Sequence, residues 1–435
     1  SPGWPAASRA DHRPFMSRLH TFYWLVATQT LSIIGSRMTS IAVGIRVFAD
    51  TGDTAPLLLT SFFNELPAML GSSFAGVLVD RWNRKQVIIL ADAGQALGSL
   101  LLMVSFLSGG FQLWHLYVVA LAQGICAMFQ EPAKDASTTL LVPEHQRERA
   151  NAIQAMAFPL AGVAAPALTG VLYVTVGIGG VILIDVLTFL VAVVVVYCVH
   201  IPQPAQSDEG RAAQGSLWQE WRGGLRYLRL RPALLGLVLY FTLMNFLLNG
   251  PLGLSIPFVI SVTGSEAMSG LILAAESLGG VAGTAILAIW GGTRPRIHTL
   301  MPAMLLVGLM FLAYGSARQP LALGISIFLL MLPLNGWALY TALIQVKTPP
   351  DMQGRVFALV NQLGYLGATL SFLITGPLVD DALEARAAAP GEGMGLLLVG
   401  TGVIILILTL AVYALPAIRS LEAQLPDYEA VAVGD

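Results

Sequence analysis

Long apolar runs separated by short polar segments make up most of the sequence. Crossing about 30 Å of hydrocarbon takes roughly 20 helical residues, and about twelve runs reach that length. They lie at 20–49, 56–80, 86–108, 113–141, 150–175, 179–200, 233–261, 268–291, 298–316, 321–346, 355–379 and 394–415. Because unpaired backbone groups are not tolerated in hydrocarbon, each run predicts a transmembrane helix. The sequence therefore predicts an all-α membrane protein.

Composition and charge exclude several other classes of protein. Hydrophobic residues make up 56% of the chain and charged residues 11%, against about 25% charged residues in soluble proteins. The net charge of −2 gives no basic footprint for nucleic acid. Cys126 and Cys198 lie in apolar runs and predict neither a disulfide nor a metal site. No cofactor is expected, and the first run is expected to be a retained helix rather than a cleaved leader.

The distribution of Lys and Arg predicts the orientation in the membrane. Of the 23 cations, 18 fall in segments on the same side as the N-terminus, and only Arg318 and Arg386 fall in the alternate loops. Since cationic loops stay cytoplasmic, both termini are predicted to be cytoplasmic. The predicted order is an N-terminal segment at 1–19, a six-helix half at 20–200, a linker at 201–231, a second half at 232–415 and a tail at 416–435.

The linker and an internal repeat relate the two halves. In the linker, apolar residues recur at helical spacing among arginines, which predicts an amphipathic helix near lipid phosphates. A structural clamp between the halves and a regulatory role are equally weighted for this helix. The segment 143–172 can be laid on 349–378 without a gap, so that Arg149 meets Arg355 and Thr169-Gly170 meets Thr375-Gly376. Such duplication predicts a substrate site between two parallel halves that rock to give alternating access.

A charged turn after the second run carries a family signature. The ten residues from Gly76 to Lys85 read G-V-L-V-D-R-W-N-R-K. They resemble the loop signature of the major facilitator superfamily, G-x-L-x-D-R-x-G-R-K. The resemblance implies a conformational latch that holds the outward-facing state through Asp80 and the start of the eleventh span. The predicted latch residues are Gly76, Asp80, Arg81, Arg84, Lys85, Glu131, Asp135 and Arg355.

A second motif lies in the fifth span. Residues 161–170 are similar to the antiporter motif of drug exporters, G-x-x-x-G-P-x-x-G-G, with Pro166 and Gly170 in place and Gly162 as a further small residue. Three of its five positions depart, since Ala161, Ala165 and Thr169 stand where the motif has glycine. Close helix packing without any antiport meaning explains the same residues. In the fourth span Gln123-Gly124 follows Ala120, where proton-linked exporters often have arginine. The usual proton relay of such exporters is therefore in doubt.

Within the superfamily, four phrases of the sequence resemble one branch. They are Asp80 to Lys85, Phe129 to Ala133, Ile184 to Phe189 and Thr348 to Arg355. The chain is similar there to the macrolide-efflux and enterobactin-exporter branch. This resemblance implies a bacterial inner-membrane protein that exports drugs or siderophores by proton antiport.

Ionisable residues inside the spans are functional candidates, because they cost several kcal/mol or more in hydrocarbon. Arg37 and Glu65 lie at similar depths on neighbouring helices and could form a buried pair that protonation opens; a static ion pair is the alternative. Glu276 has the same spacing in its span as Glu65, which would suit a cationic substrate. We expect Glu65 or Glu276 to carry proton coupling. Asp185 is interpreted as a structural cap near the outer end of the sixth span.

Neutral polar and aromatic side chains are candidates for the substrate cavity. Two asparagines precede a helix-breaking Gly-Pro sequence in the seventh span, which predicts a bend or gate. Hydrogen bonds between helices, or aromatic packing, are the alternative uses. The predicted cavity residues are Gln123, Asn245, Asn249, Trp337, Tyr340, Asn361 and Gln362.

Together these features predict a transporter and not an enzyme, since no hydrolase triad, metal cluster or nucleotide loop is found. The leading function is secondary-active export of amphipathic small molecules, with protons as the coupling ion and a monomer in the lipid bilayer. A lipid or lysolipid flippase of the same fold is the nearest alternative. A non-transporting membrane sensor is the alternative from a different class.

Overall fold

Helices account for the regular structure of the chain. The computed structural model describes residues 15–143, 146–199, 201, 217–334, 336–425 and 427–428. The first half contains α1 (Phe15–Thr51), α2 (Ala55–Arg81), α3 (Arg84–Leu107), α4 (Leu113–Leu141), α5 (Arg147–Ala155) and α6 (Ala157–Cys198). The short α8 (Leu217–Arg229) follows. The second half contains α9 (Pro232–Gly253), α10 (Ser255–Thr263), α11 (Glu266–Trp290), α12 (Ile297–Ser316), α13 (Pro320–Leu334), α14 (Gly336–Val346), α15 (Pro350–Pro377) and α16 (Glu392–Ala414). The short turns η2 (Leu378–Leu383), η3 (Glu384–Arg386), α17 (Pro416–Arg419) and α18 (Leu421–Gln424) complete it.

The predicted all-α membrane architecture is confirmed. In the described residues, ten helical segments are long and apolar enough to cross a membrane. One of them, 152–198, contains two predicted spans joined at Gly177, whose φ of 68° kinks the helix. The second predicted span corresponds to α2, a 27-residue helix outside those ten. The helices thus match the predicted spans one by one.

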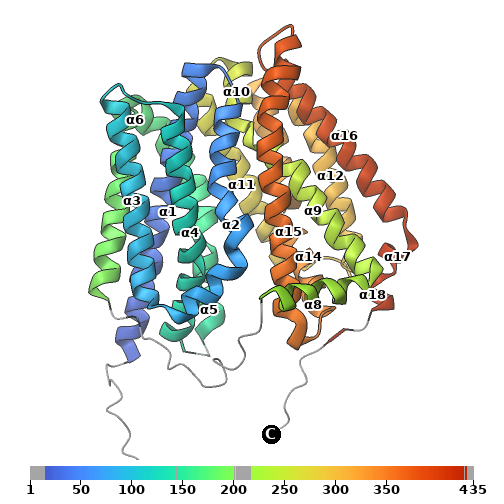
Figure 1. Ribbon diagram of the computed structural model, residues 1–435. Helices are drawn as coiled ribbons and strands as arrows, with labels where there is room; N and C mark the ends of the chain where they lie inside the picture. Colours follow the sequence, from blue (N-terminus) through green and yellow to red (C-terminus); the bar gives the residue numbers. More distant parts are fainter. Residues whose placement is uncertain are drawn as a thin grey trace, which may run out of the picture.

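The two halves pack side by side (Figure 1). Within the first half α1 packs on α6 and α4 packs on α2 and α3. Within the second half α9 packs on α15, and α12 packs on α13 and α16. Two helix pairs, α2 with α15 and α6 with α11, join the halves. The predicted repeat therefore places its two copies, in α6 and α15, at the interface between the halves.

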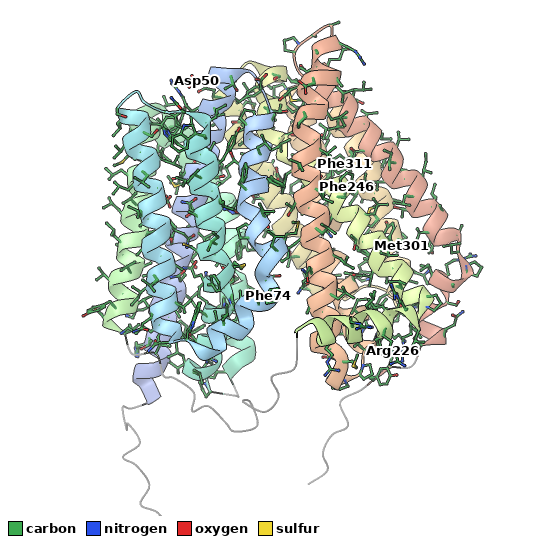
Figure 2. All side chains as sticks on the ribbon, in the orientation of Figure 1. Asp50, Phe74, Arg226, Phe246, Met301 and Phe311 are labelled. Atoms are coloured by element: carbon green, nitrogen blue, oxygen red, sulfur yellow. The ribbon has the colours of Figure 1, made fainter. Side chains whose placement is uncertain are left out.

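The two ends of the bundle differ in charge. At the lower end in Figures 1 and 2 lie α8 with Arg226 and the turn between α2 and α3 with Arg84 and Lys85. We call this the basic end. The opposite end, with Asp50 labelled in Figure 2, is called the acidic end. It carries Asp50, Asp53, Glu266, Asp380, Asp381, Glu384 and Glu392.

The helix predicted in the linker is attached to the second half. A Cβ on Gly224 would lie 2.6 Å from the carbonyl oxygen of Arg355, so α8 approaches the start of α15 closely. The hydroxyl of Tyr227 donates to the carbonyl of Lys347 at 2.7 Å. These contacts attach α8 to the second half, and the clamp between the halves stays a prediction. The side chains of Trp218 and Trp221 lie outside the described ones.

The C-terminal segment closes the basic end of the second half through one lysine. Lys347 is only 2% exposed, and its Nζ donates to the carbonyls of Glu422 at 2.7 Å and Leu425 at 2.6 Å. The same Nζ forms an ion pair with Asp427 at 2.5 Å. A buried ammonium is stable only when such partners replace its water.

We expect Lys347→Met to destabilise the protein by about 3 kcal/mol, because the carbonyls of the tail lose their donor. The thermal midpoint should fall in a thiol-reactive dye assay that uses the partly buried Cys126 as reporter. Arg419→Met is the control, since Arg419 is exposed and donates only at 3.4 Å to the carbonyl of Ala414. Equal midpoints for both variants would contradict the role of Lys347.

Candidate functional site

The halves are joined tightly at the acidic end. Asp380, just after α15, accepts hydrogen bonds from the backbone amides of Thr54 at 2.9 Å and Ala55 at 2.7 Å, and from the Thr54 hydroxyl at 2.8 Å. A Cβ on Gly376 would lie 2.6 Å from Cα of Ala55. Asp380 therefore caps the first turn of α2, where unpaired amides and the helix dipole favour a carboxylate.

Toward the basic end the two interface helices separate. Gln362 of α15 donates to the carbonyl of Met69 of α2 at 3.3 Å, near the middle of both helices. Beyond this level α2 and α15 diverge in Figure 1, and Phe74 of α2 is 52% exposed. The described contacts thus hold α2 and α15 together at the acidic end, whereas the two helices are separated at the basic end.

Two opposite charges, an exposed Arg37 and a partly buried Glu276, lie beside the second helix pair. The charges of Arg37 on α1 and Glu276 on α11 interact, and Glu276 Oε2 is buried without a hydrogen-bond partner. A Cβ on Gly162 of α6 would lie 3.2 Å from the Arg37 guanidinium and 2.9 Å from the Ser277 hydroxyl. The described interactions do not join Arg37 to Glu65, because the Arg37 guanidinium approaches α6 and interacts with Glu276 on α11.

Glu65 lies elsewhere on the interface. The charges of Glu65 on α2 and Glu131 on α4 both act on the Tyr365 hydroxyl of α15. Asn361 is exposed and lies one turn before Tyr365 on the same face of α15. Two carboxylates of the first half are thus within electrostatic range of a polar strip on the second half, and no described hydrogen bond joins them to it. We call Arg37, Glu65, Glu131, Glu276 and Tyr365 the inter-half site.

The antiporter-like motif also lies between the halves. A Cβ on Gly270 of α11 would lie 3.2 Å from the carbonyl oxygen of Pro166 and 3.7 Å from Cα of Gly170. Gly162 approaches Arg37 and Ser277, as described above. Small residues here allow α6 and α11 to approach closely, which is the packing interpretation of the motif.

Several predicted cavity residues are used in helix packing. Gln123 donates to the Gln95 carbonyl at 3.4 Å and to the Ser99 hydroxyl at 3.3 Å, both on α3. Asn245 and Asn249 donate to carbonyls of their own helix at 2.9 and 2.8 Å. Gln123 thus bonds α4 to α3, as the alternative of bonding between helices predicts, whereas the described bonds of Asn245 and Asn249 stay within α9. A side chain on a polar helix face can reach a neighbouring helix as readily as a cavity.

The predicted aromatic pair belongs to a cluster within the second half. The ring of Tyr340, which is 1% exposed, stacks on Phe241 with centroids 4.1 Å apart. Trp337 lies 5.0 Å from Tyr340 and is 40% exposed. Tyr340 is thus a core residue, and Trp337 alone of this pair presents an exposed face.

The predicted latch is described only in part. Arg84 donates to the Ala136 carbonyl of α4 at 3.2 Å, and Lys85 donates to the carbonyls of Tyr197 and Val199 at 2.7 and 2.8 Å. Glu131 pairs with Lys134, and Asp135 accepts from Gln154. A Cβ on Gly76 would meet nothing within 4 Å, and Arg355 lies against α8. The side chains of Asp80 and Arg81 are outside the described ones, so the latch stays a prediction.

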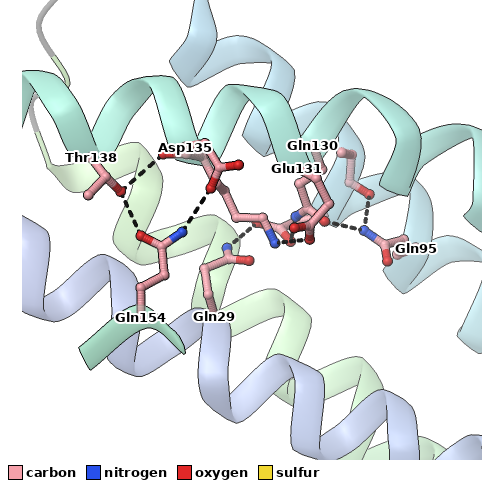
Figure 3. Close-up of polar contacts among 10 residues, drawn as sticks. Gln29, Gln95, Gln130, Glu131, Asp135, Thr138 and Gln154 are labelled. Carbon is pink, nitrogen blue, oxygen red and sulfur yellow. Dashed lines mark hydrogen bonds and ion pairs between the residues drawn. The ribbon is translucent and has the colours of Figure 1, made fainter. Parts of the chain in front are cut away.

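Two carboxylates of the first half are buried, and sequence reasoning missed one of them, Asp92. Asp92 of α3 is 0% exposed and accepts from Gln29 Nε2 at 2.9 Å and from Gln130 Nε2. Figure 3 shows Gln29, Gln95 and Gln130 converging from separate helices. Asp185, interpreted above as a cap, is 1% exposed and accepts from Ser99 at 2.7 Å and Ser36 at 3.1 Å. An aspartate inside an apolar run was the available signal for Asp92.

Comparison with known proteins decides the family. The family model of the Major Facilitator Superfamily matches residues 25–372. The chain belongs to this superfamily. It is therefore a multi-pass membrane transporter that carries small molecules, and not an enzyme.

Relatives of this facilitator include efflux proteins. It is 27% identical over 377 residues to macrolide efflux protein A of Streptococcus pyogenes, covering 82% of this chain and 89% of that protein. It is 28% identical over 385 residues to the enterobactin exporter EntS of Citrobacter koseri, covering 85% and 88%. The resemblance to this branch is confirmed.

A solved structure supports the fold of the facilitator. A bacterial homologue of the human lysosomal transporter Spinster, in an inward-facing and unoccupied conformation, has a TM-score of 0.70 at 16% identity. The match covers 96% of this chain and 99% of that one. The predicted two-half facilitator fold is confirmed.

Proposed function

We propose that this facilitator exports amphipathic small molecules across the bacterial cytoplasmic membrane in exchange for protons. The observation that carries the proposal is the inter-half site, where Arg37, Glu65, Glu131 and Glu276 lie between two apolar helix bundles. Charged groups are costly there and mark substrate or ion pathways in membrane proteins. The similarity to macrolide and enterobactin exporters supports export of drug-like or siderophore-like cargo.

The orientation follows from charge. The basic end holds Arg84, Lys85 and Arg226, and the positive-inside rule assigns such an end to the cytoplasm. Both termini are then cytoplasmic, and the closed acidic end faces outward. The arrangement corresponds to an inward-facing state ready to receive cargo from the cytoplasm. Rocking about the two helix pairs would expose the same site to the outside.

Glu276 is the proposed coupling carboxylate between the halves. Its interaction with Arg37 links α11 of the second half to α1 of the first. Protonation of Glu276 would remove this attraction and change the relative stability of the two access states. We assign contact with cargo to Glu65, whose charge acts on Tyr365 of the other half.

A flippase of lipids or lysolipids is the second candidate. A pocket of about 400 Å³ lies between helices of the second half, with a mainly apolar lining that includes Trp290, Leu306 and Leu339. Trp290 is 57% exposed at its rim. Such a pocket suits an acyl chain. The non-transporting sensor has no comparable support, because the chain belongs to a family of transporters.

The test is transport in proteoliposomes with an imposed pH gradient, screened with cationic drugs, a macrolide, a catecholate siderophore and lysolipid. We expect gradient-driven accumulation of an amphipathic drug by the wild type. Glu276→Gln should reduce it at least about tenfold while exchange of cargo without a gradient persists, because exchange needs no net proton transfer. Glu65→Gln should weaken both processes.

The control is Glu266→Gln, which makes the same change at the exposed start of α11. It should transport like the wild type. If Glu65→Gln and Glu276→Gln both keep gradient-driven accumulation, the assignment of these carboxylates is wrong. Movement of lysolipid alone would favour the flippase.

A further inference from the structure

The apolar pocket of the second half lies between α11 and α12. Its volume of about 400 Å³ is in the range of about 300–1,000 Å³ that is typical of sites for small ligands. The helix α13 packs on both α11 and α12, and it forms the back of the pocket together with α14. All described lining residues belong to the second half. An occupant of this pocket would therefore not lie between the two halves.

Small and helix-bending residues leave this space open. Gly283 of α11, Ala303 of α12 and Gly336 of α14 line the pocket with little or no side chain. Pro302 and Pro333, which also line it, lie inside α12 and α13, where proline disturbs regular helix packing. The sequence thus places its smallest and least regular residues on several sides of one space.

The pocket extends from the basic end into the bundle. On α11 its lining runs from Trp290, the last residue of the helix, back to Gly283. On α12 the lining runs from His298, the second residue of the helix, to Leu306. At 1.5 Å per residue these stretches are about 10–12 Å long. The pocket therefore reaches from the end of the span into its apolar part.

The rim of the pocket is open toward the membrane. Ile286 and Trp290 on α11 are 53% and 57% exposed, and Leu306 on α12 is 40% exposed. Exposed apolar side chains on a membrane-spanning helix contact lipid chains, which are as apolar as leucine. Trp290 lies at the end of its span, the level at which Trp side chains gather near lipid headgroups. Lipid chains can therefore enter the pocket from the side.

The turn between α11 and α12 borders the mouth of the pocket. The backbone amide of Thr293 donates to the hydroxyl of Thr299, a lining residue, at 2.7 Å. A Cβ on Gly292 would lie 3.4 Å from the side chain of Leu339, which also lines the pocket. Arg294 follows in the same turn and is exposed. Its position in the chain is thus fixed beside the mouth.

Polar groups at the mouth carry one uncompensated positive charge. Arg296 forms an ion pair with Glu422 at 3.8 Å, whereas Arg294 has no ion pair among the described contacts. His298 is exposed, and its Nδ1 is hydrogen-bonded to the hydroxyl of Tyr413 at 2.8 Å. The Nε2 of this ring has no partner in the described contacts. A cation and a ring nitrogen are therefore available to an anionic group next to an apolar pocket.

We propose that this pocket holds one acyl chain of a resident anionic phospholipid, whose phosphate group binds at the mouth to Arg294 and His298. Arginine and an imidazole N–H both donate hydrogen bonds to phosphate oxygens. Basic pockets between membrane-spanning helices on the cytoplasmic side suit such headgroups. The lipid would move with the second half during rocking. This site is independent of the proposed export.

The charge at the mouth favours an anionic lipid over a zwitterionic one. A phosphatidylcholine molecule carries its own cation beside the phosphate, so its headgroup has no net charge to attract Arg294. A phosphatidylglycerol molecule has a net negative charge, and one Arg near such a surface contributes about 1 kcal/mol, or about fivefold in affinity. The preference between these two lipids therefore reports the headgroup contact, and the position of the acyl chain reports the pocket.

The test uses phosphatidylglycerol with a photoreactive diazirine at the end of one acyl chain. This probe is added to the purified full-length protein in detergent solution, and labelled peptides are identified by mass spectrometry after irradiation. We expect the labels to concentrate in residues 283–290, 298–306 and 332–339. Half-maximal competition should need about fivefold less unlabelled phosphatidylglycerol than phosphatidylcholine.

Two variants separate the chain from the headgroup. Ala303→Phe places a ring in the pocket and should abolish labelling of its lining. Ala288→Phe is the control, because it makes the same change at an exposed position of α11 outside the lining. Arg294→Gln should leave the labelled positions unchanged and weaken binding of the probe about fivefold. Arg229→Gln, which removes an exposed arginine of α8 at the same end, should bind like the wild type.

The Arg294→Gln variant changes only an exposed residue, so it tests the site even if Ala303→Phe does not fold. Three results would overturn the resident lipid: labels spread evenly over the lipid-facing helices, equal competition by both lipids, or unchanged labelling of a folded Ala303→Phe variant. Movement of lysolipid that Ala303→Phe abolishes would also overturn it, because the pocket would then belong to a cargo path. Absence of gradient-driven transport by the wild type would contradict export alone and leave the lipid site intact.

Discussion

Replacing Asp380 with asparagine is expected to open the acidic end of the transporter and to reduce transport at least about tenfold. The carboxylate accepts from two backbone amides and a hydroxyl at the start of α2, across the interface between the halves. Because the variant loses the charge and one acceptor oxygen, the state with a closed acidic end should be destabilised by about 2–3 kcal/mol. That cost falls only on the state with a closed acidic end, and it shifts the ratio of states roughly 30- to 150-fold.

Spin labels can measure this shift. In a background without Cys126 and Cys198, labels at Asp53→Cys and Ala385→Cys lie on exposed positions of opposite halves. Asp380→Asn should increase the population of long distances between them. Asp381→Asn is the matched control, because this exposed neighbour makes none of those contacts with α2. Equal distance distributions in the two variants would contradict the capping role of Asp380.

Gly124→Ala is expected to prevent stable packing of the first half. A Cβ there would lie 2.1 Å from the Asn64 carbonyl oxygen, which is backbone and cannot move alone. Asn64 also donates to the Ala120 carbonyl at 3.3 Å, so α2 and α4 are held together on both sides of the contact. Forcing α2 and α4 apart should lower the free energy of unfolding by about 3 kcal/mol or more.

The measurement is the yield of monodisperse protein and its thermal midpoint. Gly400→Ala makes the same chemical change in α16, where an added Cβ would meet nothing within 4 Å. Its stability should be unchanged or slightly higher, because alanine restricts the unfolded chain more than glycine. A normal yield and midpoint for Gly124→Ala would show that the two helices can separate at little cost.

The helices of this protein could be predicted from the sequence because hydrocarbon imposes a length on every span. The run at 56–80 predicted α2 even though Asn64 and Glu65 interrupt it. Joining of the fifth and sixth spans across Gly177 was not predictable, since a positive φ at glycine bends the chain without ending its hydrogen-bond pattern. Length and hydropathy therefore determined the fold, and backbone detail did not follow from them.

Contacts within the candidate site were harder to predict, as Arg37 shows. Its depth could be calculated from 1.5 Å per residue, and Glu65 lies at a similar depth. Depth does not give the direction of a side chain around the helix axis or the identity of the neighbouring helix. Arg37 approaches Gly162 and interacts with Glu276, whereas the charge of Glu65 acts on Tyr365. Arg37 and Glu65 therefore have different neighbours in the structure, although their predicted depths in the membrane are similar.

Asp92 illustrates the opposite error. Its partners, Gln29 and Gln130, are 63 and 38 residues away and have no shared motif with it. The hydrophobic residues on both sides of Asp92 in the sequence suggested one more apolar helix. An ionisable residue inside a span nevertheless needs a partner, because its desolvation is costly. That energetic argument would have identified Asp92, but only the packing of α1, α3 and α4 reveals its partners.

The buried Lys347 has a consequence for the order of assembly during synthesis. Its carbonyl acceptors belong to Glu422 and Leu425, which are translated 75 and 78 residues later. Until they emerge, the ammonium must stay in water, so the connection between α14 and α15 cannot complete its packing before residues 422–425 have left the ribosome. The order of synthesis therefore makes the turns after α16 the last elements to join this half.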